Sequence, residues 1–507
     1  MTTKEPKPRG TYIPYAMDRH FLNGDAYIQM DEIYPLCKKL QPTLSYSAFR
    51  TDLAEQLRLG KLRREGSRLY LTKTLRYENS AAGYLADILS HNDLPAPELP
   101  PVLTAAEGFA LAPEQWEAVK LALSRRLSII LGGAGTGKST LIHGINQYAP
   151  GNSVHILCAP TGKAARNLTE RTGIEARTVH SALGMRPDDD FLSPVVWEYV
   201  KLVIVDEAGM ITLEMLAGIL CKIRRDCRVV LIGDPNQLLS VGSGNVLPDL
   251  LALGIPSLRL EQNHRQEDAR SSLWDNVVNF SRLHTESELV YDDTFQLKGL
   301  QGSVLAAELV KEAAKRYLRG ENVQVLSPYN RATDLSVQKL NAVIRELVNP
   351  PRPEKKELEN AEGEKFRTGD RVIITRNDRD RNCSNGDVGL LLIAGREKKD
   401  LAYTVLLPDG RCPTWDTPDG LEHMALAYAL TVHKSQGGQY DSILMPVSDR
   451  FNTMLYRNLI YTAISRGKKQ VVLYGSRNAL GVAIQKPAPK RRSKLVEKTR
   501  MNLLHCA

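Results

Sequence analysis

A strand that runs into a glycine-rich loop and a lysine constrains this chain more than any other feature of its sequence. The largely apolar run 127–131 leads into GGAGTGKST (132–140), which matches G-x-x-x-x-G-K-[ST] between an expected strand and helix. Glycines let backbone N–H groups surround a triphosphate, while the lysine supplies charge and the serine a hydroxyl for Mg²⁺. We therefore predict a site for a nucleoside triphosphate and Mg²⁺, formed by Gly133, Gly135, Thr136, Gly137, Lys138, Ser139 and Thr140.

Composition places the chain among ordinary globular proteins. A chain of 507 residues is too long to fold around a single hydrophobic core, so we predict three or four domains. Its content of 42% hydrophobic and 25% charged residues is typical of globular proteins. No apolar run reaches membrane-spanning length and the first ten residues lack a signal-peptide core, so we expect a cytoplasmic protein with no membrane contact. Seven scattered cysteines without a C-x-x-C pair indicate neither a disulfide framework nor a zinc site.

The net charge of +9 is unevenly distributed. Basic runs occur at 58–68 (RLGKLRREGSR) and 486–494 (KPAPKRRSK). They favour a polyanionic partner, although a solvated surface explains a charge run equally well. We expect the basic C-terminal tail to be disordered.

Hydrophobic periodicity divides the chain into α/β units. Strands at 127–131, 154–158, 201–205, 228–232 and 258–260 alternate with helices, and a second set follows with strands at 322–326, 442–446 and 470–474. Alternating strands with NG and DG turns interrupt the second set. The expected organisation is an N-terminal arm (1–25), a winged-helix-like α+β domain (26–93), a Pro-rich linker (94–104), a first α/β domain (105–265), a second one (266–360 and 421–480), an inserted β-barrel (361–420) and a basic tail (481–507).

Two further strand ends carry acidic and amide side chains. In KLVIVDEAGM (201–210), Asp206 ends an apolar strand where it can hold Mg²⁺, and Glu207 can activate the attacking water. In VVLIGDPNQL (229–238), Gln237 can contact water and the γ-phosphate; Asp234 before a proline is also typical of a plain turn.

Two arginines lie in separate α/β units. Arg265 stands in LRLEQNHRQ (258–266) and Arg466 in LIYTAISRGKK (459–469). Planar, permanently charged donors suit the charge that spreads over a γ-phosphoryl group during transfer. One arginine from each unit predicts a site that closes between two domains.

Taken in order, these motifs resemble those of superfamily 1 helicases, and most closely the RecD-like, 5′→3′ branch. The resemblance spans about 111–476 and also rests on APTGKAAR (159–166), TVHSALG (178–184) and TVHKSQGGQYD (431–441). It implies two RecA-like P-loop NTPase domains with ATP between them, and an SH3-like barrel inserted in the second. It further implies an ATP-dependent 5′→3′ DNA helicase or translocase that acts in repair, recombination or replication.

The resemblance also assigns residue roles. Gln115 matches a glutamine that reads adenine, while His264 and Gln439 replace a tyrosine and an acidic residue that contact the nucleotide. Segment 185–198 corresponds to a short pin hairpin that splits the duplex. The implied DNA-binding residues are Pro160, Thr161, Lys163, Arg166, Thr178, His180, Thr431, His433, Lys434 and Ser435.

Several alternatives stay open at this level. The chain can be a non-unwinding motor subunit of a larger nuclease–helicase complex, or an RNA-directed helicase, because the motifs contact mainly the polymer backbone. The expected partners are single-stranded DNA and single-strand/duplex junctions, with a nuclease or single-strand-binding protein as protein partner, and the chain is expected to be a monomer. The winged-helix-like domain either touches DNA or serves only as a packing module.

Overall fold

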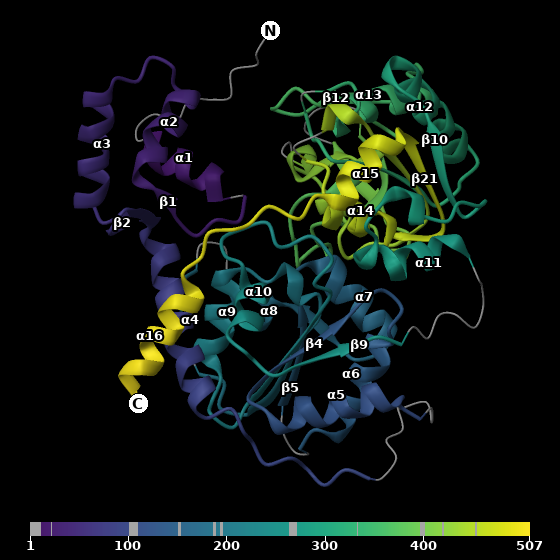
Figure 1. Ribbon diagram of the computed structural model, residues 1–507. Coiled ribbons are helices and arrows are strands. Elements are labelled where there is room, and N and C mark those ends of the chain that lie inside the picture. The colour runs from purple at the N-terminus through teal and green to yellow at the C-terminus, as the bar shows by residue number, and fades with distance from the viewer. Residues whose placement is uncertain are drawn as a thin grey trace.

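The computed structural model describes residues 12–21, 23–100, 110–150, 154–185, 189–192, 196–262, 271–331, 333–395, 401–417, 420–451 and 454–506. Two α/β lobes lie one above the other, and a small N-terminal module stands to one side of them (Figure 1). The C-terminus lies beside the first lobe rather than the second (Figure 1). Among the described helices, none combines the length and apolar character that a bilayer-spanning segment requires.

The N-terminal module is a helical unit with a three-stranded antiparallel sheet in the order β1-β3-β2. Phe49 and Leu53 from one face of its third helix are buried in the module's own core. A long helix, α4, then leads to the first lobe. The elements are α1 (Tyr12–Phe21), β1 (Ile28–Gln29), α2 (Met30–Leu40), α3 (Tyr46–Arg58), β2 (Leu62–Glu65), β3 (Arg68–Leu71) and α4 (Thr72–Ser90).

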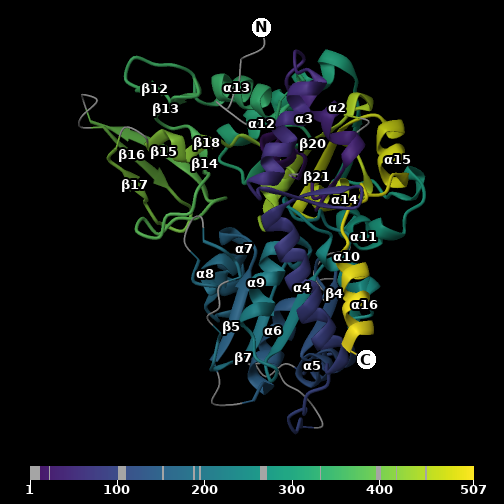
Figure 2. The ribbon, with the colours of Figure 1, turned by 90° about the vertical axis from the view of Figure 1, so that its left-hand side faces the viewer.

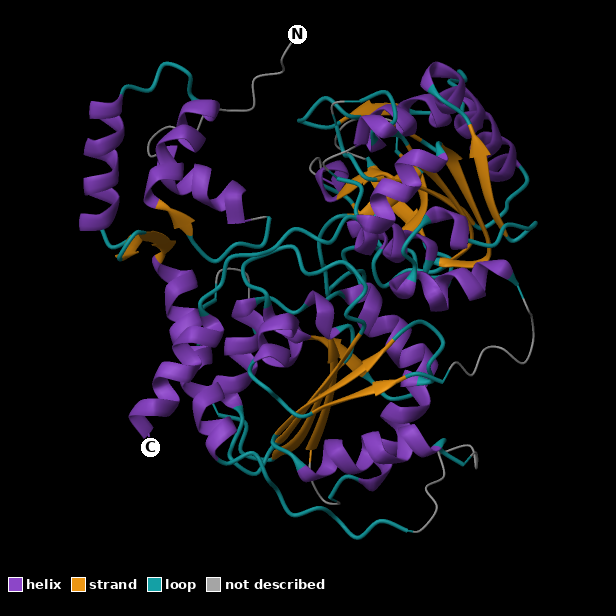
Figure 3. Cartoon of the chain, viewed as in Figure 1, coloured by secondary structure: helices purple, strands orange, loops and turns teal. Residues whose placement is uncertain are grey.

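Lobe 1 contains a six-stranded parallel sheet in the order β6-β5-β7-β8-β4-β9, with helices on both faces (Figure 3). β4 and β8 are buried along their whole length, as expected for central strands covered on both sides. The elements are α5 (Pro113–Ser124), β4 (Leu127–Gly132), α6 (Lys138–Tyr148), β5 (Val154–Ala159), α7 (Gly162–Thr172), β6 (Ala176–Thr178), α8 (Val179–Ala182), β7 (Val200–Val205), α9 (Leu213–Lys222), β8 (Arg228–Gly233), α10 (Val246–Ala252) and β9 (Ser257–Leu260).

Lobe 2 contains a five-stranded parallel sheet in the order β10-β21-β20-β11-β19. The chain leaves this sheet after α13 and returns at β19, so the segment between them is an insertion. The elements are α11 (Ser272–Asn279), β10 (Phe295–Gly299), α12 (Gly302–Leu318), β11 (Val323–Ser327), α13 (Val337–Val348), β19 (Ala429–Thr431), β20 (Tyr440–Val447), α14 (Arg457–Ile464), β21 (Gly467–Gly475) and α15 (Arg477–Gln485).

The insertion is antiparallel throughout. A two-stranded ribbon precedes a five-stranded sheet in the order β17-β16-β15-β14-β18, which lies apart from the N-terminal module beside lobe 2 (Figure 2). Burial alternates along β15, so one face of this sheet is packed and the other meets solvent. The strands are β12 (Glu357–Glu359), β13 (Lys365–Arg367), β14 (Arg371–Ile374), β15 (Val388–Ala394), β16 (Ala402–Leu406), β17 (Thr414–Trp415) and β18 (Met424–Leu426).

The structure confirms the predicted strands of both lobes and adds some that the periodicity missed. β6 and β10 are short edge strands without a marked apolar run. α4 begins at Thr72, directly after the last strand of the N-terminal module. The reason is the burial of Thr74, Tyr77, Glu78 and Ala81, which has the spacing of a helix face.

The expectation of a disordered basic tail is wrong. The first residues of the tail, 481–485, belong to α15. A further helix, α16 (Leu495–Cys506), lies along α4 (Figure 1). Leu495 is fully buried in the core shared with lobe 1, and the Lys498 ammonium lies 3.0 Å from a Glu65 carboxylate oxygen. Two basic residues of the tail, Arg492 and Lys498, therefore neutralise acidic groups of the N-terminal module.

We expect Leu495→Ala to lower the free energy of docking of α16 by about 2–5 kcal/mol, because it removes a buried branched side chain and leaves a cavity. Hydrogen exchange of the α16 amides and urea unfolding measure the loss. Leu504→Ala is the matched control: Leu504 lies on the same helix but is 79% exposed, so its effect stays within about 0.5 kcal/mol. Equal effects of the two substitutions would contradict the buried position of Leu495.

Candidate nucleotide site and strand groove

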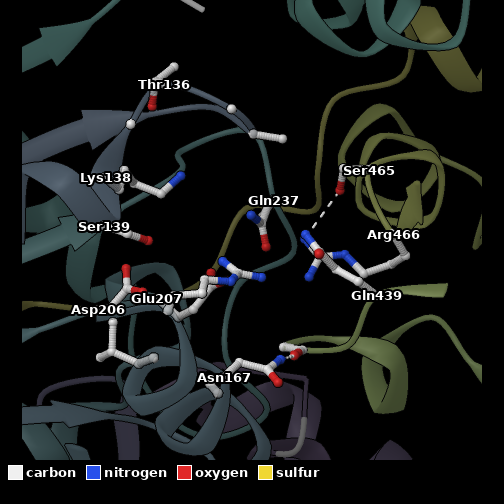
Figure 4. Close-up of a pocket in the computed structure, with 17 residues that line it drawn as sticks. Thr136, Lys138, Ser139, Asn167, Asp206, Glu207, Gln237, Gln439, Ser465 and Arg466 are labelled. Atoms are coloured by element: carbon white, nitrogen blue, oxygen red, sulfur yellow. Dashed lines mark hydrogen bonds between the residues drawn. The ribbon is translucent and has the colours of Figure 1, made fainter. Parts of the chain in front are cut away.

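A cavity of about 260 Å³ lies between the two lobes, at the carboxyl ends of the lobe 1 strands (Figure 4). This is the edge of a parallel sheet where ligands bind in α/β proteins. Side chains and backbone from both lobes line it: Ala134, Gly135, Thr136, Gly137, Lys138, Ser139, Ala164, Asn167, Leu168, Arg171, Asp206, Glu207, Gln237, Gly437, Gln439, Ser465 and Arg466. Most residues predicted for catalysis and nucleotide binding therefore meet in one place.

The loop after β4 has the geometry of a phosphate cradle. Gly135 and Gly137 have φ of 85° and 73°, in the left-handed region that favours glycine. A Cβ on Gly132 would lie 2.5 Å from the Thr136 hydroxyl, so that position is also closed to larger residues. Lys138 Nζ donates to the Gly132 and Gly133 carbonyls at 2.8 and 2.7 Å. The ammonium is thus held over the loop at the start of α6.

The acidic pair follows β7 directly. Burial raises the pKa of Asp206 to about 6, and the neighbouring Glu207 charge acts in the same direction, while the Lys138 charge lowers it. Asp206 Oδ1 is buried and has no hydrogen-bond partner among the described residues. Glu207 has φ of 53°, which is unusual for a residue with a side chain and turns the chain sharply into the 3₁₀ turn Ala208–Met210. The orphan oxygen leaves room for a cation as its partner.

Lobe 2 closes the cavity with Arg466. Its guanidinium is buried and donates to Thr462 O at 3.2 Å, to Ser465 Oγ at 3.2 Å and to Gly438 O at 3.5 Å. Figure 4 shows Arg466 and Gln237 on the two sides of the same space. Gln237 Oε1 is buried and, within the described residues, has no hydrogen-bond partner. Both side chains can therefore contact an anion that is bound between the lobes.

Not every predicted nucleotide residue reaches this cavity. Gln115 Oε1 accepts from Ala112 N at 3.0 Å and its Nε2 donates to Gly137 O at 3.3 Å, so its amide supports the loop from behind. Gly133 begins the loop and Thr140 lies in α6, both outside the cavity lining. His264 and Arg265 lie outside the described residues.

Seven of the lining residues were not predicted from the sequence, and two of them carry polar side chains on one helix of lobe 1. Asn167 and Arg171 lie on α7, where the i, i+4 spacing from Lys163 places all three on one side of the helix. Asn167 Nδ2 donates to Gly437 O of lobe 2. That spacing was the available signal, but it does not show which side of α7 faces the nucleotide.

A second recess, the strand groove, lies where lobe 1, lobe 2 and the insertion meet. It consists of two cavities of about 350 and 670 Å³ that share Gly162, Thr178, His180 and Asn377. Seven of the predicted DNA-binding residues line the smaller cavity and Arg166 lines the larger one: Pro160, Thr161, Lys163, Thr178, His180, His433 and Lys434. The predicted set is therefore largely brought together, across both lobes.

Thr431 and Ser435 are the exceptions in that set. Ser435 is fully buried and donates to Val432 O at 2.7 Å, while Thr431 Oγ1 accepts from Lys434 N at 3.2 Å. Neither lines the groove. Both side chains instead shape the turn that presents Lys434.

The groove also contains residues that the motifs did not indicate. The insertion contributes Asn377, Arg379, Ser384, Asn385 and Gly386. Arg166 forms an ion pair with Asp387 of the insertion, which fixes that domain against α7. Burial lowers the pKa of both His180 and His433, so these imidazoles are mostly neutral at pH 7 and offer stacking surfaces rather than charge.

The predicted pin at 185–198 lies partly outside the described residues. In 189–192 and 196–198 the structure has no strand. The Phe191 ring instead packs on Tyr77 and His180, with centroid distances of 5.9 and 5.3 Å. A pin hairpin stays a prediction.

Tyr461 and Asp234 link the lobes beside the loop after β4. The Tyr461 hydroxyl donates to Asp234 Oδ2 at 2.5 Å, and both side chains are buried. We expect Tyr461→Phe to lower the free energy of unfolding by about 1–3 kcal/mol, since it leaves a buried carboxylate without this donor. Urea unfolding measures the change. Tyr199→Phe, at a 74% exposed tyrosine, is the control, and equal effects would rule out the proposed link.

Comparisons with known proteins agree with this architecture. Residues 110–289 match the family described as AAA domain, residues 340–405 match the ATP-dependent RecD-like DNA helicase SH3 domain, and residues 426–474 match the UvrD-like helicase C-terminal domain. The matches follow lobe 1, the insertion and the end of lobe 2 in chain order.

Two relatives that match most of the chain carry RecD names. An ATP-dependent RecD2 DNA helicase of Deinococcus radiodurans is 32% identical over 85% of this chain, and the chain spans 59% of that relative's length. The RecBCD enzyme subunit RecD of Mycolicibacterium smegmatis is 29% identical over 74% of this chain and 73% of its own. The solved structure of Bacteroides Pif1 bound to single-stranded DNA is 21% identical, with a TM-score of 0.47 over 73% of this chain and 93% of that one. The chain is therefore RecD-like in sequence and in domain content, which confirms the resemblance that its motifs predict.

Proposed function

We propose that this chain is an ATP-dependent 5′→3′ DNA helicase or translocase that moves along single-stranded DNA. The observation that carries the proposal is the cavity between the lobes, because Lys138, Glu207 and Gln237 of lobe 1 face Arg466 of lobe 2 across it. A triphosphate bound there would touch both lobes, so its hydrolysis would change how they sit together. The direction of movement rests on the RecD-like sequence.

Each lining residue has a chemical task in this proposal. Lys138 would neutralise the outer phosphates, Glu207 would orient and deprotonate the attacking water, and Gln237 would contact both that water and the γ-phosphate. Arg466 would stabilise charge that develops on the γ-phosphoryl oxygens. Arg265 is proposed as a second such arginine from its motif alone.

The residues present also fit Mg²⁺. Ser139 lines the cavity beside Asp206, whose buried Oδ1 has no hydrogen-bond partner in the described part of the chain. An oxygen-rich pair that leaves coordination sites for phosphates and water suits this ion. When bound, Mg²⁺ would supply positive charge to the β- and γ-phosphates.

The strand groove is the proposed path of the single strand. It joins basic and neutral polar groups from three domains and has no acidic residue among its described lining. Contacts of this type reach mainly the phosphate backbone and tolerate any sequence. Neutral His180 and His433 can add stacking with bases.

A second candidate follows from the relatives named RecD, a subunit of a larger enzyme. In that case the chain would translocate only inside a complex with a nuclease. Polarity-resolved unwinding by the purified chain separates the two candidates. Strand separation from a 5′-tailed duplex and none from a 3′-tailed duplex supports the helicase; ATP hydrolysis without unwinding supports the subunit.

We expect Lys138→Ala to abolish ATP hydrolysis stimulated by single-stranded DNA, because the outer phosphates lose their ammonium partner. A coupled ATPase assay with and without DNA and RNA oligomers measures this and also tests the RNA-directed alternative. ATP turnover by the intact chain that no polynucleotide accelerates would refute the motor.

Arg466→Ala should lower the DNA-stimulated kcat by roughly 10³–10⁵ while ATP binding changes less, since this group acts on charge formed during transfer. Steady-state kinetics and nucleotide binding by fluorescence give the two values. Arg477→Ala is the control, because that arginine lies nearby in sequence on the exposed surface of α15. A loss in binding as large as the loss in kcat would contradict the role.

A further inference from the structure

We propose that the outer face of the N-terminal module binds duplex DNA. The partner is recognised as DNA through the proposed motor function, but the surface itself lies outside the nucleotide cavity and the strand groove. We call this surface the winged face. It consists of Tyr46, Ser47, Arg50, Thr51, Ala54 and Arg58 on α3, and of Lys61, Arg63 and Arg64 beside and within the β2–β3 hairpin.

One side of α3 is exposed, with no element of the described residues packed over it. Phe49, Leu53 and Gln56 point into the module, while positions 47, 50, 51, 54 and 58 are exposed with the spacing of a single helix face. In Figure 1, α3 is the outermost helix on the left, and in Figure 2, which looks onto that side, it lies in front. A helix face this far from the lobes contributes little to their packing.

The chemistry of the winged face suits a polyanion rather than an apolar partner. Arg50, Lys61, Arg63 and Arg64 form no ion pair within the described residues. The nearby carboxylates of Glu55 and Glu65 are neutralised by Arg58 at 2.7 Å and Lys498 at 3.0 Å, which leaves Asp52 as the remaining acidic group on α3. Unpaired cations attract the closely spaced phosphates of a duplex.

The helices and the hairpin are arranged as in a helix-turn-helix unit that is followed by a wing. α2 and α3 are joined by the short turn 41–45, so α3 occupies the place of the second helix in a helix-turn-helix unit. Such a helix fits the major groove and directs its first residues to the bases. Here those residues are Ser47, Arg50 and Thr51, and the hairpin with Arg63 and Arg64 follows as a wing toward the backbone.

The C-terminal segment holds the winged face in a fixed place relative to the motor. Arg492 N donates to Asp25 Oδ1 at 2.7 Å and its guanidinium pairs with Glu32, both in the module. The preceding Arg491 donates to Ser240 Oγ and Gly244 O of lobe 1, each at 3.1 Å. A duplex on the winged face would therefore keep its position relative to the strand groove.

The test uses the full chain with Arg50→Ala, Arg63→Ala and Arg64→Ala combined. Fluorescence anisotropy measures binding to a labelled blunt-ended hairpin duplex and to a single-stranded oligomer across a salt series. We expect the duplex Kd to rise at least about tenfold and the salt slope to fall by up to about 3, since each phosphate contact contributes about 0.9. Single-strand affinity and DNA-stimulated ATP hydrolysis should stay within about twofold of the unaltered chain.

A matched variant removes three exposed cations elsewhere: Lys311→Ala and Lys315→Ala on α12, and Arg319→Ala at the residue that follows it. It should leave duplex binding unchanged, which separates a local site from net charge. Urea unfolding checks that both variants are folded. Unchanged duplex affinity in the winged-face variant overturns the proposal, as do equal losses in both variants or a parallel loss of single-strand binding. If the unaltered chain binds duplex through this face but shows no DNA-stimulated ATP hydrolysis, the motor proposal fails and the winged face stands.

Discussion

Charges of both signs gather where the lobe 1 strands end, in a partly buried cluster, and much of the structure serves to hold them there. Lys138, Asp206 and Asp234 follow β4, β7 and β8, which are neighbours in the sheet. Burial raises the pKa of both aspartates, and the Lys138 charge opposes that shift. Such a cluster is costly without further partners. A triphosphate with its cation would supply those partners, so binding and the closing of the lobes favour each other.

The loop after β8 is the physical connection between the two proposed sites. Leu238 N donates to Thr462 Oγ1 at 2.8 Å, and Leu238 O accepts from Gln436 Nε2 at 2.9 Å, so this residue is bonded to two motifs of lobe 2. Gln237 lines the nucleotide cavity, whereas Val241, four residues later, lines the strand groove. In the proposed motor, a change at the γ-phosphate would therefore reach the groove through one short segment. Packed segments of this kind shift between discrete positions rather than deform continuously.

Local sequence signals predicted most strands of the two lobes. They also predicted most of the residues with polar side chains that line the nucleotide cavity. The P-loop and the acidic strand end are each continuous in sequence. Their glycines, carboxylates and apolar runs can therefore be identified from the sequence alone. Arg171 and the groove residues Asn377 and Asn385 were missed because their importance arises from the meeting of distant segments. Gln115 was assigned by resemblance, yet its amide is bonded to Ala112 and Gly137. The sequence pattern also failed to predict the ordered C-terminal tail. A basic helix that docks on acidic groups has the same composition as a basic segment exposed to solvent, and the acidic partners lie far away in the sequence.

The path of the C-terminus has a mechanical consequence. After α15 the chain leaves lobe 2, passes lobe 1 at Arg491 and ends along α4. Residues 486–494 therefore connect units whose relative positions would change in the proposed motor. Arg491 donates to Ser240, and Ser240 N donates to Gly209 O behind the acidic pair. The bridge is therefore attached next to the nucleotide site on one side and to the N-terminal module on the other. In the proposed motor, movement between the lobes would act on this segment directly, and the module that carries the winged face is bound to it.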